Sequence, residues 1–380
     1  MSNSSDEYPT RLNEDTRPGE GSPRRLLSLD VFRGFVVASM LLVNTILWNN
    51  ATPRQLMHAP WARGVTFTDM ILPWFVFSMG VAIPLHSADP ASSQRSGRVP
   101  FLKIFRRAAV LVALGVFIDS LVDHRVVVGL DVLQLLGLAY LVAALLSPMP
   151  AWGRLTVAGV LLAGHWALIE FAPVPGYGAH VLEEQHNIIR YLDDTYLARY
   201  HLAGVLSVGP ASALALLGTA AGDLVRTSIS GRGKFGILVL AGLGLAFGGM
   251  LWSQDLPLSK FLWTSSYAVV SGGVGLVLLG ICYLLFDVVR LRAPGFPFAV
   301  FGTNAILAYV APILVNVQVL EAWHYTLPTG TVVPLQSAII GYLAGHFGAV
   351  LTMWIYTGMI IVAWWLILLG LYRKHILVRV

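Results

Sequence analysis

A histidine and an aspartate stand in one polar loop between two long apolar stretches. His58 lies in the middle of this loop and Asp69 at its end, with Trp61 between them. A neutral imidazole has an unperturbed pKa of about 6.5, so it can take a proton from an amine or hydroxyl near neutral pH. A carboxylate in contact with the ring can orient it and stabilise the imidazolium. The alternative is an interfacial histidine beside a tryptophan of the aromatic belt.

The apolar stretch before this loop carries three polar side chains. Asp30 and Arg33 are three residues apart, so on a helix they share a face and can pair. Arg33 would either hold a phosphate group or serve as a topology signal at the helix end. Asn44 lies near the other end, where hydrocarbon offers no hydrogen-bond partner. It therefore predicts either a site facing a cavity or a hydrogen bond between helices.

A basic run follows the second apolar stretch and holds Arg95, Arg98, Lys103, Arg106 and Arg107. It can set topology at the lipid surface, or it can meet an anionic cofactor at the inner face. The chain contains no P-loop, no HExxH motif and no Cys/His metal array, and no GxGxxG follows a strand. These absences argue against an ATP-driven pump, a zinc enzyme and a dinucleotide enzyme, and we expect no metal.

The composition indicates the elements that must position these residues. Of 380 residues, 56% are hydrophobic and 12% are charged, and the mean hydropathy is +0.70. We predict an all-α fold, a polytopic membrane helix bundle. The net charge of +5 is interpreted as a topology signal, and we expect no nucleic acid partner. Cys282 is the single cysteine, so no intrachain disulfide can form.

We expect about ten membrane-spanning helices between a short tail and the C-terminus. Residues 1–25 are polar and predict a disordered cytoplasmic tail ahead of a transmembrane domain at 26–380. Residues 335–347 are apolar but too short to cross, which predicts an interfacial or partly inserted helix. The predicted spans are 34–48, 70–85, 104–122, 127–147, 155–172, 203–224, 235–252, 264–287, 298–319 and 349–371.

Charge bias gives this arrangement an orientation. With both termini inside, 19 of the 25 Lys and Arg residues fall on the cytoplasmic side. This follows the positive-inside rule and places the His58 loop and residues 173–202 outside. Polar residues within or near the spans predict a site, a water-filled cavity or interhelical hydrogen bonds. Besides Asn44 they are Asp119, Asp131, Gln134, His165 and Asn304.

Several segments in order resemble the heparan-alpha-glucosaminide N-acetyltransferase family of membrane acyltransferases. The most telling two are SLDVFRGFVVASMLLVN and HAPWARGVTFTDMILPWFVFSMGVAI. Others are VLQLLGLAYLVA, GVLSVGPASALALLGTAAGDLV, KFLWTSSYAVVSGGVGLVLLGICYLLFD, FGTNAILAYV and LYRKHILVRV. The resemblance covers nearly everything after residue 24. It departs between Trp61 and Thr66, where the chain has Ala-Arg-Gly-Val in place of a shorter Asn-Gly-type link.

The resemblance implies acetyl transfer from cytoplasmic acetyl-CoA to an amine or hydroxyl of an extracytoplasmic sugar or glycan. It implies His58 as the catalytic base or acyl acceptor, Asn44 as the family's helix asparagine and Asp69 as the motif carboxylate. Asp30 and Arg33 match the family's SLDxxRG motif. With Arg106 and Arg107 they are our candidate donor-binding residues. The chain looks like a bacterial-type member without the large outer N-terminal domain, so we expect an acceptor other than a heparan sulfate polymer.

Two other classes fit the composition equally well: a transporter and a non-catalytic polytopic protein. Broken helices in corresponding halves would favour the transporter, whereas acetyl-CoA binding would favour the enzyme. We expect an inner (plasma) membrane location, contact with membrane lipid and a homodimer as a candidate assembly.

Overall fold

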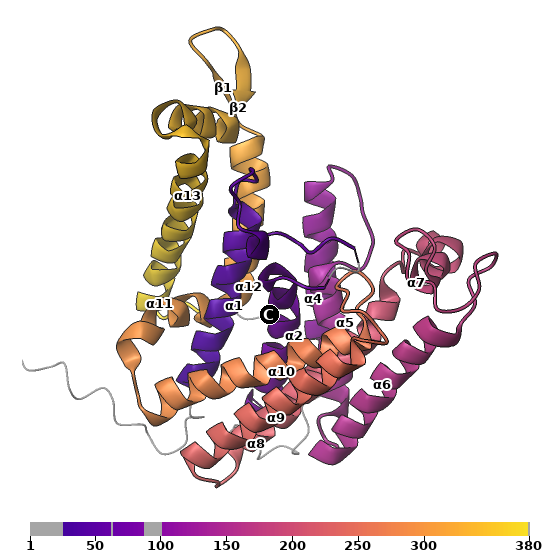
Figure 1. Cartoon of the computed structure of the whole chain (residues 1–380). Helices are drawn as coiled ribbons and strands as arrows, with labels where there is room; N and C mark the ends of the chain where they lie inside the picture. Colours follow the sequence, from indigo (N-terminus) through magenta and orange to yellow (C-terminus); the bar gives the residue numbers. More distant parts are fainter. Residues whose placement is uncertain (1–25, 62–63, 87–100, 379–380) are drawn as a thin grey trace, which may run out of the picture.

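The computed structural model describes residues 26–61, 64–86 and 101–378, and most of them are helical (Figure 1). The long helices are α1 (Leu27–Thr45), α2 (Phe67–His86), α4 (Phe101–Val122), α5 (Val132–Leu146), α6 (Ala151–Phe171), α8 (Val208–Arg226), α9 (Gly231–Trp252), α10 (Ser265–Cys282), α11 (Arg292–Thr303), α12 (Ala305–Val315) and α13 (Leu335–Arg373). Short helical segments are η1 (Arg54–Leu56), α7 (Ile188–Leu192), η2 (Asp193–Leu197), η3 (Ala198–Tyr200), η4 (Val205–Ser207), η5 (Tyr283–Val288) and η6 (Asn316–Glu321). The predicted tail at 1–25 lies outside the described residues.

The prediction of an all-α polytopic membrane protein is confirmed. Among the described residues, seven helices are long and apolar enough to span a membrane, and α11 with the following segment to Glu321 forms an eighth candidate bent by 68°. The two other predicted spans correspond to α4 and α5, which have 22 and 15 residues. Helix α4 begins with the charged residues Lys103, Arg106 and Arg107, and helix α5 is short. By length and composition alone, neither therefore qualifies as a membrane span.

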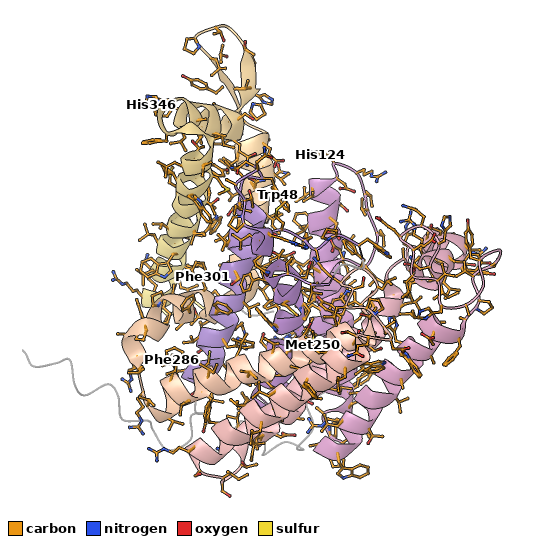
Figure 2. The ribbon with its side chains drawn as sticks, in the orientation of Figure 1. Trp48, His124, Met250, Phe286, Phe301 and His346 are labelled. Atoms are coloured by element: carbon orange, nitrogen blue, oxygen red, sulfur yellow. The ribbon has the colours of Figure 1, made fainter. Side chains whose placement is uncertain are left out.

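Helix α1 runs through the middle of the bundle and is buried against α2 and α11. Its closest neighbour is α11, because two glycines let the backbones touch. A Cβ added at Gly34 would overlap the Phe298 carbonyl, and one at Gly302 would overlap the Asp30 carbonyl. Helices α1 and α4 run in the same direction, so the segments after them, marked by Trp48 and His124, reach the same end of the molecule (Figure 2). Helix α10 leads to Phe286 at the other end.

The break between α11 and α12 is closed by the end of the chain. Asn304 lies at this break and is 1% exposed. Its Nδ2 donates to the Ile376 carbonyl at 3.1 Å, and its Oδ1 accepts from the Val378 N–H at 2.8 Å. Asn304 was expected to face a site or to bond across spans. It instead satisfies the backbone of the C-terminal segment, which the apolar surroundings would otherwise leave unpaired.

Helix α13 consists of two parts separated at Gly348, which has a φ of 71°. The part before the break matches the short apolar helix predicted at 335–347, and it lies crosswise at the end of the bundle (Figure 1). Strands β1 (His324–Thr326) and β2 (Val332–Pro334) pair antiparallel next to it. The break explains why the largely apolar segment 335–347 precedes the final span without extending it.

Two of the remaining intramembrane polar residues meet each other. Gln134 of α5 donates from Nε2 to the Asp119 carboxylate of α4 at 2.5 Å. This is the interhelical hydrogen bond expected for Gln134. His165 of α6 is buried, and its Nε2 lies 3.0 Å from the Leu262 carbonyl. Both contacts hold helices or loops together and lie outside the His58 loop.

Candidate functional site

The predicted pair in the polar loop is in direct contact. His58 Nδ1 lies 2.7 Å from Asp69 Oδ1. The imidazole is 45% exposed, whereas the carboxylate is 2% exposed. A buried carboxylate thus fixes one nitrogen of a ring whose other edge can be reached from outside. Asp69 can therefore orient the ring, which is the arrangement that a general base or a nucleophilic histidine needs.

Asp69 is fixed by the way in which α2 begins. Its second oxygen, Oδ2, accepts from the backbone N–H groups of Ala59 and Thr66, each at 3.0 Å. The bond to Thr66 resembles half of a capping box, in which the third helical residue bonds back to the residue before the helix. The bond to Ala59 joins the residue after His58 to the same carboxylate. Tyr267 of α10 donates its hydroxyl hydrogen to the Asp69 carbonyl.

The His58 loop is also held by an aromatic contact with neighbouring loops. The Trp61 ring stacks on Phe261 with centroids 5.4 Å apart, and its Nε1 donates to the Leu182 carbonyl at 2.8 Å. Trp61 packs against a small apolar cluster that contains Ile169, Val174, Ile188, Ile189, Leu256 and Leu262. The 173–202 segment and the loop before α10 therefore both contact the His58 loop at Trp61.

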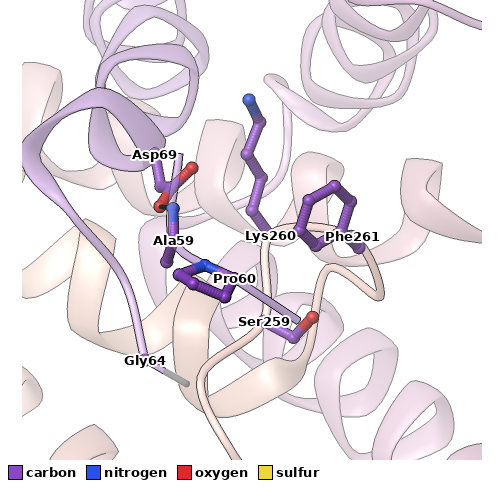
Figure 3. Close-up of a pocket in the computed structure, with 7 residues that line it drawn as sticks. All are labelled: Ala59, Pro60, Gly64, Asp69, Ser259, Lys260 and Phe261. Carbon is purple, nitrogen blue, oxygen red and sulfur yellow. Dashed lines mark hydrogen bonds between the residues drawn. The ribbon is translucent and has the colours of Figure 1, made fainter. Parts of the chain in front are cut away.

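Lys260 is a further neighbour of His58 that could not be paired with it from the sequence. Its Nζ lies 3.3 Å from His58 Nδ1 and 3.5 Å from Nε2. Lys260 lies in the loop before α10, more than two hundred residues after His58 in the sequence, and the fold places the two side chains in contact. Figure 3 shows Lys260 and Asp69 bordering the same cleft, with Ser259 and Phe261 beside them. One signal was available: Lys260 is the single lysine among the six basic residues predicted outside, and it stands within the apolar segment LPLSKFLW.

The surroundings of Lys260 alter its proton affinity. Burial lowers the pKa of Lys260 below 10.5, although the carboxylates of Asp69 and Asp131 act in the opposite direction. Lys260 also lines a second cavity, of about 150 Å³, together with Asp131 and Trp263. The other lining residues are Leu72, Leu130, Val132, Leu135, Gly204 and Ser207. The ammonium group thus stands between the histidine and an adjoining cavity.

Asn44 is not bonded to the histidine pair. It lies in the last turn of α1 with an exposed side chain, and no hydrogen bond of its amide is found within the described part of the chain. Asp30 and Arg33 lie in the first two turns of the same helix and are partly buried. Eleven residues of α-helix separate Arg33 from Asn44, which is about 16 Å along the axis. The structure therefore divides the predicted residues between the two ends of α1.

Arg106 and Arg107 lie near the start of α4, at the end of the molecule where α1 also begins. Arg106 is exposed. The Arg107 guanidinium lies over the Tyr140 ring of α5, 4.8 Å from its centroid. Its Nε is buried and has no hydrogen-bond partner within the described ranges. Arg107 thus retains an unused donor, which suits an anionic group.

Comparisons with known proteins agree with the resemblance found in the sequence. Residues 25–230 match a family model described as heparan-alpha-glucosaminide N-acetyltransferase, catalytic. The enzymes named heparan-alpha-glucosaminide N-acetyltransferase from Mus musculus and Homo sapiens are each 26% identical to the chain, over 79% of it and 55% of their own length. The chain thus spans about half the length of these curated relatives. Since the family model matches more than half of the chain, the chain belongs to the heparan-alpha-glucosaminide N-acetyltransferase catalytic family.

Proposed function

We propose that this protein is an integral membrane acyltransferase. It moves an acetyl group from acetyl-CoA on one side of the membrane to an amine or hydroxyl of a sugar or glycan on the other. The observation that carries the proposal is the contact between exposed His58 and buried Asp69 at the end of an apolar helix bundle. Membership of an acetyltransferase family supports the same reaction class.

His58 acts as the base that activates the acceptor. Asp69 Oδ2 already accepts two N–H groups, so the carboxylate acts as an acceptor and Nδ1 donates to Oδ1. The lone pair of Nε2, which lies 3.5 Å from the Lys260 ammonium, is then the one that takes a proton. As the acceptor nitrogen or oxygen bonds to the thioester carbon, its proton passes to Nε2. The carbon–sulfur bond breaks, and the sulfur leaves with the proton from His58 as the CoA thiol.

Two neighbouring groups stabilise charge during this step. The thioester oxygen becomes negative as the tetrahedral intermediate forms, and fixed donors or cations there lower the barrier. The Lys260 ammonium is next to the histidine and supplies such a charge. Asn44 has an exposed amide and donates to the same oxygen. In a second route Nε2 attacks the thioester carbon, the carbon–sulfur bond breaks and CoA leaves as its thiolate. The acceptor then attacks the acyl-histidine, loses its proton to solvent and releases His58.

The donor binds along α1. Its phosphates lie near Arg33, Arg106 and Arg107, and Asp30 orients the Arg33 end of the helix. The unpartnered Nε of Arg107 supports this assignment, because a buried donor without an acceptor is costly and a phosphate oxygen would satisfy it. The extended pantetheine arm then spans the length of α1 and carries the thioester toward Asn44 and His58.

The membrane orientation is part of the proposal. Charge bias places the start of α1 and α4 in the cytoplasm, where acetyl-CoA is made, and both termini on that side. The His58 loop then faces outward with the acceptor. For a chain with this bias we propose the inner (plasma) membrane.

The transporter alternative is less well supported. Transporters of the inverted-repeat type place broken helices around a substrate cavity. The bent pair α11–α12 is one such break, but Asn304 and the C-terminal segment fill it with protein hydrogen bonds.

Acetylation of glucosamine by the purified protein tests the proposal. Wild-type protein in lipid nanodiscs should convert acetyl-CoA and glucosamine to N-acetylglucosamine, detected by mass spectrometry. His58→Ala should lower turnover by about a hundredfold or more. His124→Ala is the matched control, since His124 is an exposed histidine at the same end of the molecule. A folded His58→Ala protein with wild-type turnover would remove His58 from the mechanism.

A further inference from the structure

We propose that the cavity lined by Asp131, Lys260 and Trp263 is the acceptor subsite, and that Asp131 selects acceptors carrying a protonated amine over neutral ones. This rests on the proposed acyl transfer at His58. It adds a specificity residue that directly precedes α5, whereas His58 lies in a loop and Asp69 on α2.

The cavity adjoins the reacting group through one side chain. Lys260 lines it and at the same time lies within 3.5 Å of both ring nitrogens of His58. Leu72 comes from α2, the helix whose first turn contains Asp69. Only the Lys260 side chain separates a molecule seated in the cavity from the imidazole. An acceptor held there reaches past Lys260 to pass its proton to His58.

Asp131 has a carboxylate that the fold does not use. It directly precedes α5, in a position where aspartate commonly caps a helix, yet its side chain makes no capping hydrogen bond. It is exposed, and no hydrogen bond or ion pair of this carboxylate is found among the described residues. Its electrostatic neighbours include Lys260 and Tyr309. A carboxylate at a cavity wall with no structural duty is suited to bind a cation from outside.

The size and lining of the cavity describe its occupant. A volume of about 150 Å³ is comparable to that of a cavity known to admit a single six-membered ring. Leu72, Leu130 and Leu135 give it apolar walls, Trp263 adds an aromatic face, and Ser207 adds a hydroxyl. Such a lining suits a compact ring with apolar faces and a polar edge.

The two charges of the cavity order the steps of binding. A protonated amine is attracted to Asp131 and repelled by the Lys260 ammonium, so it enters at the Asp131 end. Only the neutral amine is a nucleophile, and the repulsion near Lys260 favours loss of the extra proton to solvent. His58 then takes the second proton as the neutral amine bonds to the thioester carbon. Asp131 thus contributes to acceptor binding, whereas His58 contributes to turnover.

Steady-state kinetics with glucosamine and glucose as acceptors test this assignment, because they differ by an amine in place of one hydroxyl. Asp131→Asn should raise KM for glucosamine about tenfold, with kcat and the KM for glucose within about twofold of wild type. Asp131→Glu should recover part of the loss. Asp123→Asn is the control, since Asp123 is an exposed carboxylate near Arg125 in the preceding loop. An unchanged glucosamine KM in Asp131→Asn would overturn the proposal.

A second variant and a binding measurement separate this subsite from the acyl transfer. Ser207→Phe narrows the cavity and should raise KM for both acceptors; unchanged values would place the acceptor elsewhere. Glucosamine binding without acetyl-CoA is measured by calorimetry. If wild type transfers no acetyl group but binds glucosamine in an Asp131-dependent way, the proposed reaction fails and the subsite stands. If glucosamine binds Asp131→Asn as tightly as it binds wild type, the proposed subsite is wrong, whether or not the protein transfers an acetyl group.

Discussion

Asp69 holds His58 with one carboxylate oxygen and the backbone around it with the other. Oδ1 contacts the imidazole at 2.7 Å, and Oδ2 accepts from the N–H groups of Ala59 and Thr66. One buried carboxylate therefore sets the ring, the loop that carries the ring and the first turn of α2. This arrangement favours the tautomer of His58 that carries its proton on Nδ1.

Asp69→Asn removes the negative charge of this side chain and keeps its shape, so it tests whether the charge is needed. The asparagine oxygen would accept the two backbone N–H groups, so its NH₂ group would face His58 and donate to Nδ1. The proton of the ring then moves to Nε2, which can no longer act as a base. We expect turnover to fall by about a hundredfold or more while acetyl-CoA binding persists. Turnover is measured by acetylation of glucosamine, and acetyl-CoA binding by calorimetry. Near-normal turnover in Asp69→Asn would contradict the proposal that Asp69 sets the tautomer of His58.

Lys260 should make stability depend on pH. Burial lowers its pKa in the folded protein below 10.5, so between the lowered value and 10.5 the unfolded chain binds more protons. Stability then rises with pH across that window, and the penalty is present in full below it. Lys260→Met should be more heat-stable than wild type near neutral pH, and the difference should shrink toward pH 10.5. Exposed Lys103→Met is the control. A constant difference in Tm across this range would contradict the prediction.

Arg107 should contribute to donor binding. A ligand at about a hundred times its Kd stabilises the folded state by about 2.7 kcal/mol, so saturating acetyl-CoA should raise Tm. Arg107→Gln should reduce this shift, and higher salt should reduce it in wild type because phosphate contacts are screened. Arg232→Gln is the control: Arg232 is exposed at the start of α9, and its replacement should leave the Tm shift caused by acetyl-CoA unchanged. Equal Tm shifts in Arg107→Gln and Arg232→Gln would show that the CoA phosphates do not bind at Arg107.

The glycine contact between α1 and α11 should be sensitive to one methyl group. Gly302→Ala places a Cβ against the Asp30 carbonyl and should destabilise the protein by about 1–3 kcal/mol. Gly209→Ala is the matched control in α8, since an added Cβ there meets nothing within 4 Å. Thermal unfolding in detergent compares them. Equal stabilities would show that α11 can move away from α1 at no cost.

Cysteine labelling of intact cells should report the orientation. In a Cys282→Ser background, Arg190→Cys should react with a membrane-impermeant maleimide and Arg232→Cys should not. Both positions are exposed on the protein, so burial does not account for a difference. Labelling after permeabilisation is the control for Arg232→Cys. The reverse pattern would invert the charge-based orientation and the donor route with it.

Much of the architecture was determined by the sequence, because membrane spans depend on local properties. Runs of apolar residues of bilayer length predict helices wherever they occur, since lipid leaves backbone groups no other partner. The apolar segment 335–347 is too short to cross the membrane, which predicted a break before the last span. The structure places this break at Gly348. Asp69 could also be paired with His58 from their shared loop, and the Thr-Phe-Thr-Asp start of α2 fixes the carboxylate locally.

Only the tertiary structure brought Lys260 and Asp131 to this site. Both lie far from His58 in the sequence, and periodicity within a helix carries no information about which loops meet at its end. Their proximity depends on how α2, α5 and α10 pack and on the apolar cluster that seats Trp61. Asn304 shows the same limit: its intramembrane position predicted a polar partner, but only the fold identified that partner as the backbone at Ile376 and Val378. Local patterns fix helices, whereas the contacts between distant side chains arise from packing the whole chain.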